Sequence, residues 1–145
     1  IPALFTNHAF FWGDVHIRNL GRERAYFLSP LKSALKKGIV ATDHTDWGVT
    51  PLNQLFLLWT AVERKSRSGE IVGPDEQLSP LEALRTITIN GAYQYKEENS
   101  KGSIEKGKLA DLVILSDDIT TIPAEQIKDV TVLETIKEGK SIFKK

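Results

Sequence analysis

The chain has 145 residues, of which 41% are hydrophobic and 26% charged, an ordinary composition for a soluble globular protein. The chain has 19 basic residues (Lys and Arg) and 19 acidic residues (Asp and Glu). It therefore lacks the surplus of basic residues that binds nucleic acid or an anionic membrane. The absence of Cys excludes disulfides, thiolate nucleophiles and cysteine-based zinc sites. We therefore expect a soluble protein, cytoplasmic or exported, without nucleic-acid or membrane partners.

The start of the chain has the character of an internal segment. The sequence contains no Met, and Ile1 to Phe5 is apolar without the basic flank of a signal peptide. We expect a fragment whose beginning lies upstream.

Residues 3–6 form a short apolar run that predicts a buried strand. Residues 7–29 are aromatic-rich and irregular, which favours a long and functional loop. A helix is expected over 31–37 and a second buried strand over 38–42, followed by a polar cluster at 43–46. This order predicts a parallel, right-handed βαβ unit.

Two further helices are expected from the periodicity of apolar residues. The first begins near Pro51 and shows a wide apolar face, made by Leu52, Leu55, Phe56, Trp59 and Val62. A polar loop follows at 66–75. The second helix begins at a capping box of Ser79 and Glu82 and runs to about Ala92, with a predicted buried stripe of Leu81, Leu84, Ile87 and Thr88.

The character of the chain changes near residue 100. Strands are expected over 111–115, 130–136 and 141–143. The tight turn at 138–140 predicts that the last two strands form a β-hairpin. The first part is therefore α/β and the second mainly β.

Residues 101–115, KGSIEKGKLADLVIL, resemble the C-terminal signature of the amidohydrolase superfamily, a long and specific match. Residues 78–85 and 88–93 are similar to the final barrel helix of that superfamily. Within it, residues 46–53 (DWGVTPLN), 5–9 (FTNHA) and 20–25 (LGRERA) resemble segments of the amidohydrolase 3 (YtcJ-like) group.

The resemblance covers nearly the whole chain and implies an α/β fold that is part of a larger one. Residues 1–100 would be the last two β/α units, the seventh and eighth, of a TIM-like metal-dependent-hydrolase barrel. Residues 101–145 would be the closing strands of a small composite β-sandwich. The rest of the same enzyme chain is then the expected partner.

The resemblance also implies a site. Members of the family use a divalent metal, commonly zinc, and a carboxylate that takes a proton from the attacking water. Asp46 is the implied metal ligand and general base, and Asp43, closer to the strand, is the alternative carboxylate. Judged from spacing alone, Asp46 is equally suited to capping the helix near Pro51. His8, His44 and Trp47 are candidate substrate-binding residues.

Two departures from the family pattern concern the pocket wall. Trp47 and Gly48 stand where the family commonly has Ala-Pro, and Asp43, His44 and Thr45 stand where many members have a Gly-Ser pair.

The three histidines, at positions 8, 16 and 44, do not form the His-x-His that holds metal in this family. Catalytic zinc needs about three protein ligands, so we expect the chain alone to bind zinc weakly or not at all and to be inactive.

The predicted function is the C-terminal part of a hydrolase of non-peptide, amide-like C–N bonds in small molecules. The alternative is an independent, non-catalytic binding or assembly module. Open strand edges and uncovered helix faces further predict self-association of the isolated chain.

Overall fold

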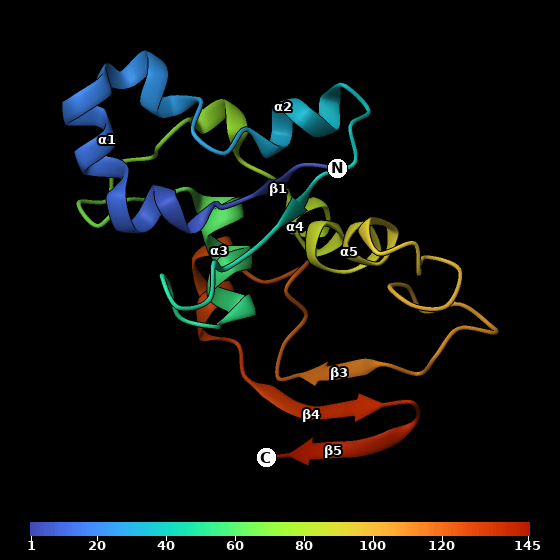
Figure 1. Cartoon of the computed structure of the whole chain (residues 1–145). Helices are drawn as coiled ribbons and strands as arrows, with labels where there is room; N and C mark the ends of the chain where they lie inside the picture. Colours follow the sequence, from blue (N-terminus) through green and yellow to red (C-terminus); the bar gives the residue numbers. More distant parts are fainter.

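Two short parallel strands lie at the centre of the N-terminal part of the structure (Figure 1). The structure is a computed structural model that describes residues 1–145. Strand β1, Ala3–Leu4, pairs with β2, Thr42–Asp43, and the register joins Leu4 to Asp43. The predicted parallel pair is confirmed. The second strand is shorter than expected, and it includes Asp43 instead of ending before it.

The segment between these strands is helical, so the prediction of a long loop over 7–29 is wrong. Helix α1, Asn7–Tyr26, is kinked at Gly21, and helix α2, Leu31–Lys36, follows it. Packing explains the helix: Phe10 contacts Phe56 and Trp59. A Cβ on Gly13 would lie 2.6 Å from a methyl of Val72, so this glycine permits the close approach of α1 to the 66–72 loop.

Helix α3, Gln54–Glu63, begins later than predicted because Asn53 caps it, accepting a hydrogen bond from the Phe56 N–H at 3.0 Å. Leu52, assigned to its apolar face, lies outside the helix and is exposed. The interior residues of α3 are nearly all buried. This helix is therefore the central element of the core.

The expected capping box of Ser79 and Glu82 is present at the start of α4, Pro80–Ile87. The predicted single helix is broken at Thr88, where ψ is −95°, and α5, Ile89–Gln94, continues beyond it. The buried positions of α4 are Ala83 and Thr86, whereas Leu81 of the predicted stripe is exposed.

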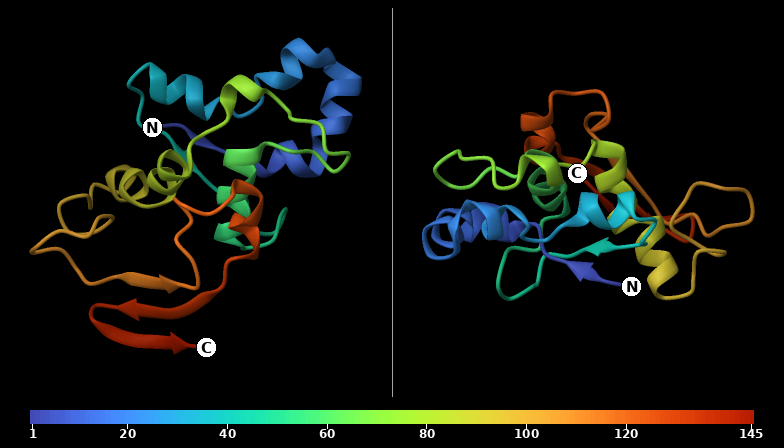
Figure 2. Two further views of the ribbon diagram at one scale, coloured as in Figure 1. Left: turned by 180° about the vertical axis from the view of Figure 1, so that it is seen from behind. Right: turned by 90° about the horizontal axis from the view of Figure 1, so that it is seen from above.

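A three-stranded antiparallel sheet forms the C-terminal part, in the order β3-β4-β5. Its strands are β3, Leu112–Leu115, β4, Val132–Lys137, and β5, Lys140–Lys144. The predicted β4–β5 hairpin is confirmed, and positive φ at both Glu138 and Gly139 is typical of a type I′ turn. The sheet lies at one end of the molecule, away from β1 and β2 (Figures 1 and 2).

The core joins both parts of the chain. Two short 3-10 helices span Pro74–Glu76 and Ala124–Asp129. The helix Ala124–Asp129 packs against α3. Residues Ile119, Ile127 and Val130 therefore share one buried cluster with Leu58, Trp59 and Val62. Residues 119–130 thus tie the C-terminal segment to the α/β part.

Candidate functional site

The carboxyl ends of β1 and β2 meet at one edge of the parallel pair, because the strands run in the same direction and Leu4 is paired with Asp43. Thr6 and Asn7 follow β1, and His44 follows β2. In parallel α/β folds this edge is where ligands and reacting groups are held. All predicted site residues except His8 lie on or directly after β2, and His8 lies in the first turn of α1.

Asp43 is a buried carboxylate with its hydrogen-bonding capacity taken up by neighbours. One oxygen accepts the Thr6 N–H at 3.0 Å and the His44 N–H at 3.1 Å, and the other accepts the Thr6 O–H at 2.5 Å. Burial raises the pKa of Asp43 to about 7, although the Thr6 and His44 hydrogen bonds and the charge of Arg64 act in the opposite direction. These contacts keep Asp43 away from solvent.

Asp46 is exposed, in contrast with Asp43. It lies on the loop Thr45–Thr50 with a φ of 50°, in the left-handed region, and its backbone N–H donates to Nδ1 of His44 at 3.1 Å. No side-chain partner occupies its carboxylate, which is therefore free to bind a ligand. His44 Nδ1 acts as an acceptor here, so a neutral His44 carries its proton on Nε2.

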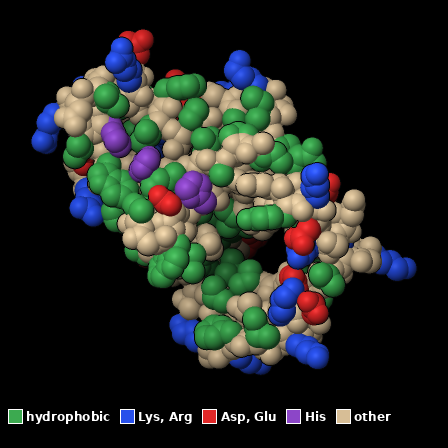
Figure 3. Space-filling model, viewed as in Figure 1, with side chains coloured by type: hydrophobic (Ala, Val, Ile, Leu, Met, Phe, Trp, Pro, Cys, Tyr) green, Lys and Arg blue, Asp and Glu red, His purple; other side chains and the backbone are tan.

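The three histidines gather on the same face as Asp46. His8 packs against Phe5 with ring centroids 4.3 Å apart, and the His16 ring lies 5.7 Å from that of His8. The His44 ring stacks on Phe5 as well, with ring centroids 5.3 Å apart and ring planes inclined by 19°. In the space-filling view the histidine side chains follow one another across this face (Figure 3).

Electrostatic coupling links these side chains. Burial lowers the pKa of His8, the nearby His16 and His44 lower it further, and the carboxylate of Asp46 raises it. His16 was not among the predicted site residues. His16 lies beside His8 because both belong to α1. The sequence signal for this neighbourhood is their spacing of eight residues, which places both side chains near one face of a helix.

Trp47, the third candidate substrate-binding residue, is 72% exposed. It is next to Asp46 on the loop but packs against no other aromatic ring in the structure. A ring in this position is available to a ligand that contacts Asp46.

Several buried polar residues behind the site were not predicted. The Thr6 hydroxyl lies 3.0 Å from that of Thr60, which is also 2.9 Å from Oδ1 of Asn7. Nδ2 of Asn7 donates to the Thr50 hydroxyl at 2.9 Å. Single Thr and Asn residues carry no sequence signal for such a network, because the partners come from three separate segments.

The donors of this chain do not make a complete metal centre. No group of three or more His, Cys, Asp or Glu side chains converges in a way that could hold a metal ion. A carboxylate oxygen is a normal zinc ligand, so the exposed Asp46 could supply one ligand.

Among the helices of the chain, none combines the length and the apolar character that a membrane-spanning helix requires.

Carboxylates and imidazoles of this α/β structure thus lie at the carboxyl ends of a parallel pair of strands, the edge at which α/β proteins hold ligands. The chain belongs to the amidohydrolase family, whose profile matches residues 1–143. The recognition of the family from residues 5–9, 46–53 and 101–115 is confirmed.

Individual relatives agree with this assignment. The chain is 34% identical over 135 residues to N-substituted formamide deformylase of Arthrobacter pascens, covering 90% of this chain and 24% of the relative. It is 29% identical over 132 residues to the Bacillus subtilis protein that carries the amidohydrolase name YtcJ, covering 89% and 25%. The chain thus spans about a quarter of the length of these two relatives.

The fold is shared with solved structures. An uncharacterised metal-dependent hydrolase from Pyrococcus horikoshii superposes with a TM-score of 0.69 at 21% identity, covering 84% of this chain and 25% of the other. At this identity the likeness concerns the fold alone.

Proposed function

We propose that this chain is the C-terminal part of a metal-dependent amidohydrolase that hydrolyses non-peptide, amide-like C–N bonds in small molecules. One observation carries the proposal. This chain belongs to the amidohydrolase family, and its Asp46 carboxylate is exposed near three histidines, on the side where the parallel strands end. The relatives are about four times as long, which supports the view that the remaining site residues belong to other parts of the enzyme.

Asp46 is the proposed catalytic carboxylate and metal ligand. It is exposed and has no side-chain partner, whereas Asp43, the alternative, is buried with both oxygens bound to neighbours. A general base must reach the attacking water, and of these two carboxylates Asp46 is the exposed one. Asp46 would accept a proton from the water and return it to the leaving nitrogen as the C–N bond breaks.

Zinc is the proposed metal of the complete enzyme. When bound, such an ion lowers the pKa of its water and polarises the substrate carbonyl. Asp46 would supply one oxygen ligand, and the other ligands would come from segments outside this chain, the His-x-His of the family among them. Isolated, the chain is proposed to lack activity because its own donors do not converge on one point.

His8, His44 and Trp47 are proposed to contact the substrate. Both imidazoles pack against the ring of Phe5, and Trp47 is exposed beside Asp46. Imidazole N–H groups can donate to a substrate carbonyl or leaving group, and the indole offers an apolar wall.

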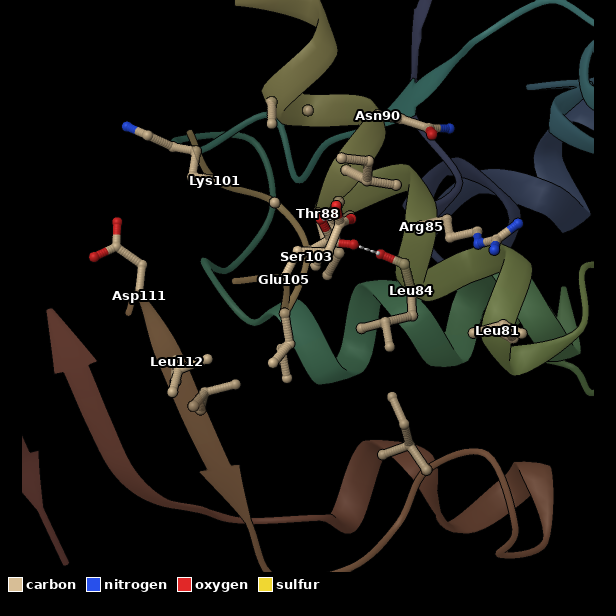
Figure 4. A pocket seen from close by; sticks show the side chains of 18 of the residues that line it. Leu81, Leu84, Arg85, Thr88, Asn90, Lys101, Ser103, Glu105, Asp111 and Leu112 are labelled. Atoms are coloured by element: carbon tan, nitrogen blue, oxygen red, sulfur yellow. Dashed lines mark hydrogen bonds between the residues drawn. The ribbon is translucent and has the colours of Figure 1, made fainter. Parts of the chain in front are cut away.

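The rest of the same enzyme is the proposed partner of the uncovered surfaces. Residues 1–100 would supply two β/α units of its barrel and residues 101–145 the closing strands of a β-sandwich. A groove of about 1090 Å³ lies between α4 and β3 (Figure 4). Four exposed apolar or aromatic side chains line it, Leu81, Tyr95, Ile104 and Val113. Without that partner, these surfaces and the open edges of β1 and β2 would promote self-association.

The test uses the full-length protein, purified with and without added zinc and assayed on a panel of N-substituted formamides, acylated amines and cyclic amides. Asp46→Asn is expected to lower kcat at least about 100-fold and to reduce bound zinc, measured by elemental analysis. Asp75→Asn, an exposed carboxylate far from the strand ends in sequence, is the matched control and should behave as wild type.

Two outcomes would contradict the proposal. Retained activity in Asp46→Asn together with loss in Asp43→Asn would transfer the catalytic role to Asp43. A reading frame that lacks an upstream His-x-His, with no hydrolysis of any amide, would favour the non-catalytic binding or assembly module.

A further inference from the structure

The loop that carries Asp46 is closed at its base. The hydroxyl of Thr50 donates to the carbonyl of Thr45, so that the first and last residues of the loop are joined. Within it, the Val49 N–H donates to the Asp46 carbonyl at 2.8 Å. Thr45 and Thr50 are 5% and 4% exposed, whereas Asp46 and Trp47 between them are exposed. The loop is thus anchored at two buried points and projects its middle into solvent.

Buried side chains connect Thr50, at the end of the loop, to both strands. Nδ2 of Asn7 donates to the Thr50 hydroxyl at 2.9 Å, and Oδ1 of the same amide lies 2.9 Å from the Thr60 hydroxyl. Thr60 in turn lies 3.0 Å from the hydroxyl of Thr6, which donates to Asp43. This network, made of Thr6, Asn7, Asp43, Thr50 and Thr60, is buried throughout, and no member is more than 7% exposed.

Thr50 fills two roles in the network at once. Its single proton goes to the Thr45 carbonyl, and a lone pair accepts the proton from Asn7. A hydroxyl is able to do both, whereas an aliphatic group of the same shape can do neither. Because an unsatisfied buried polar group costs about 1–3 kcal/mol, these two bonds favour the loop position in which the Thr50 hydroxyl meets both of its partners.

We propose that Thr50 and Asn7 are positioning residues that hold the Asp46 loop in its reactive place relative to the ends of β1 and β2. The proposal rests on the proposed function in that Asp46 is the reacting carboxylate. Neither side chain contacts the substrate, and their effect passes through the backbone of the loop. A misplacement of about 1 Å at a reacting group can lower the rate about 100-fold, so a small displacement of the loop is sufficient.

The experiment compares Thr50→Val, which keeps the shape and removes the hydroxyl, with Thr50→Ser, which restores the hydroxyl. Thr86→Val is the matched control: Thr86 is buried, and its hydroxyl bonds only the Ala83 carbonyl one turn earlier in α4. All three are made in the full-length protein. Amide hydrogen exchange is measured on the peptide that covers residues 44–50, and kcat and KM are measured on the amide panel.

Thr50→Val is expected to speed exchange of the Val49 and Thr50 amides at least about tenfold, without loosening α3 beyond the effect of Thr86→Val. On any substrate that is turned over, kcat should fall about 10- to 100-fold with KM within about twofold, and Thr50→Ser should restore both. If Thr50→Val does not fold, Asn7→Leu serves in its place, because it removes the amide that donates to Thr50 at similar size and adds no charge at this fully buried position.

Equal exchange of the loop in Thr50→Val and Thr86→Val would overturn the positioning role. So would a kcat that falls equally in both variants, because the loss would then follow stability alone. Failure of the proposed function looks different. In that case no variant, wild type included, hydrolyses an amide, whereas the exchange comparison still decides whether Thr50 holds the loop.

Discussion

Asp43 on β2 and Thr6 after β1 are joined by two hydrogen bonds, since the Asp43 carboxylate accepts both the N–H of Thr6 at 3.0 Å and its O–H at 2.5 Å. The pair closes the carboxyl end of the parallel strands, beside the register pair Leu4 and Asp43. The two candidate carboxylates therefore have different environments. Asp43 is buried, and Asp46, three residues later, is exposed.

The first prediction concerns the pH dependence of stability caused by Asp43. Its pKa is about 7 in the fold and 3.8 ordinarily, so between these values the folded state binds more protons than the unfolded state. The free energy of unfolding therefore decreases as pH rises through this window, by about 2–3 kcal/mol between pH 5 and pH 8 from Asp43 alone. Below pH 3.8 the contribution is fully present.

Asp43→Asn cannot ionise and should lack this decrease. Urea unfolding of both proteins at pH 5, 6, 7 and 8 measures it, and the difference between them removes the contributions of other groups. A difference that stays constant over the whole range would show that Asp43 is already ionised in the fold.

The second prediction concerns the histidine face. Burial and the nearby His16 lower the pKa of His8, while Asp46 raises it. His16→Gln should therefore raise the pKa of His8, and Asp46→Asn should lower it further below its ordinary value. A pH titration of the imidazole proton signals by NMR measures both shifts. A His8 titration that is unchanged in Asp46→Asn would mean that the two side chains are not electrostatically coupled in solution.

The third prediction concerns Arg64, a fully buried arginine at the C-terminus of α3. Its guanidinium donates to three backbone carbonyls, those of Val72 at 2.6 Å, Leu28 at 2.6 Å and Ser29 at 3.3 Å. Arg64→Met leaves these carbonyls without their partner and should lower the free energy of unfolding by about 3 kcal/mol or more.

Arg67→Met is the control for Arg64→Met. Arg67 is exposed over the rings of Phe10 and Phe11, and its loss should cost less than about 1 kcal/mol. Chemical denaturation of the two variants tests the comparison. Equal losses would mean that the carbonyls around Arg64 find other partners.

Local signals in the sequence predicted the local structures well. The capping box at Ser79 and the turn at Glu138–Gly139 depend on neighbouring residues, and both are present. Helix α1 was missed because its stability comes from distant contacts, such as those of Phe10 with Phe56 and Trp59. Tertiary packing of this kind overrides weak helix propensity.

The site shows the same division between local and distant information. The family motif indicates Asp46, whose catalytic role stays a prediction. The burial of Asp43 depends on Thr6, which lies 37 residues away, and no spacing rule connects them. The partners of Thr50 are equally distant, because Asn7 contacts it from the start of α1. Polar networks assembled from separate segments become visible only in the folded chain.

The last prediction compares two glycines with similar backbone conformations. Gly73 has a φ of 73° and Gly69 a φ of 90°, so alanine is strained at both by about 1 kcal/mol. A Cβ at Gly73 would also lie 2.1 Å from the carbonyl oxygen of Tyr26, whereas nothing lies within 4 Å of one at Gly69. Gly73→Ala should therefore destabilise the protein by more than about 3 kcal/mol, and Gly69→Ala by only about 1 kcal/mol. Thermal and urea unfolding of the two variants measure the difference, which reports the contact between Gly73 and Tyr26 at the end of α1. Equal losses would mean that the backbone of Tyr26 moves away freely, and that this contact does not hold α1 in place.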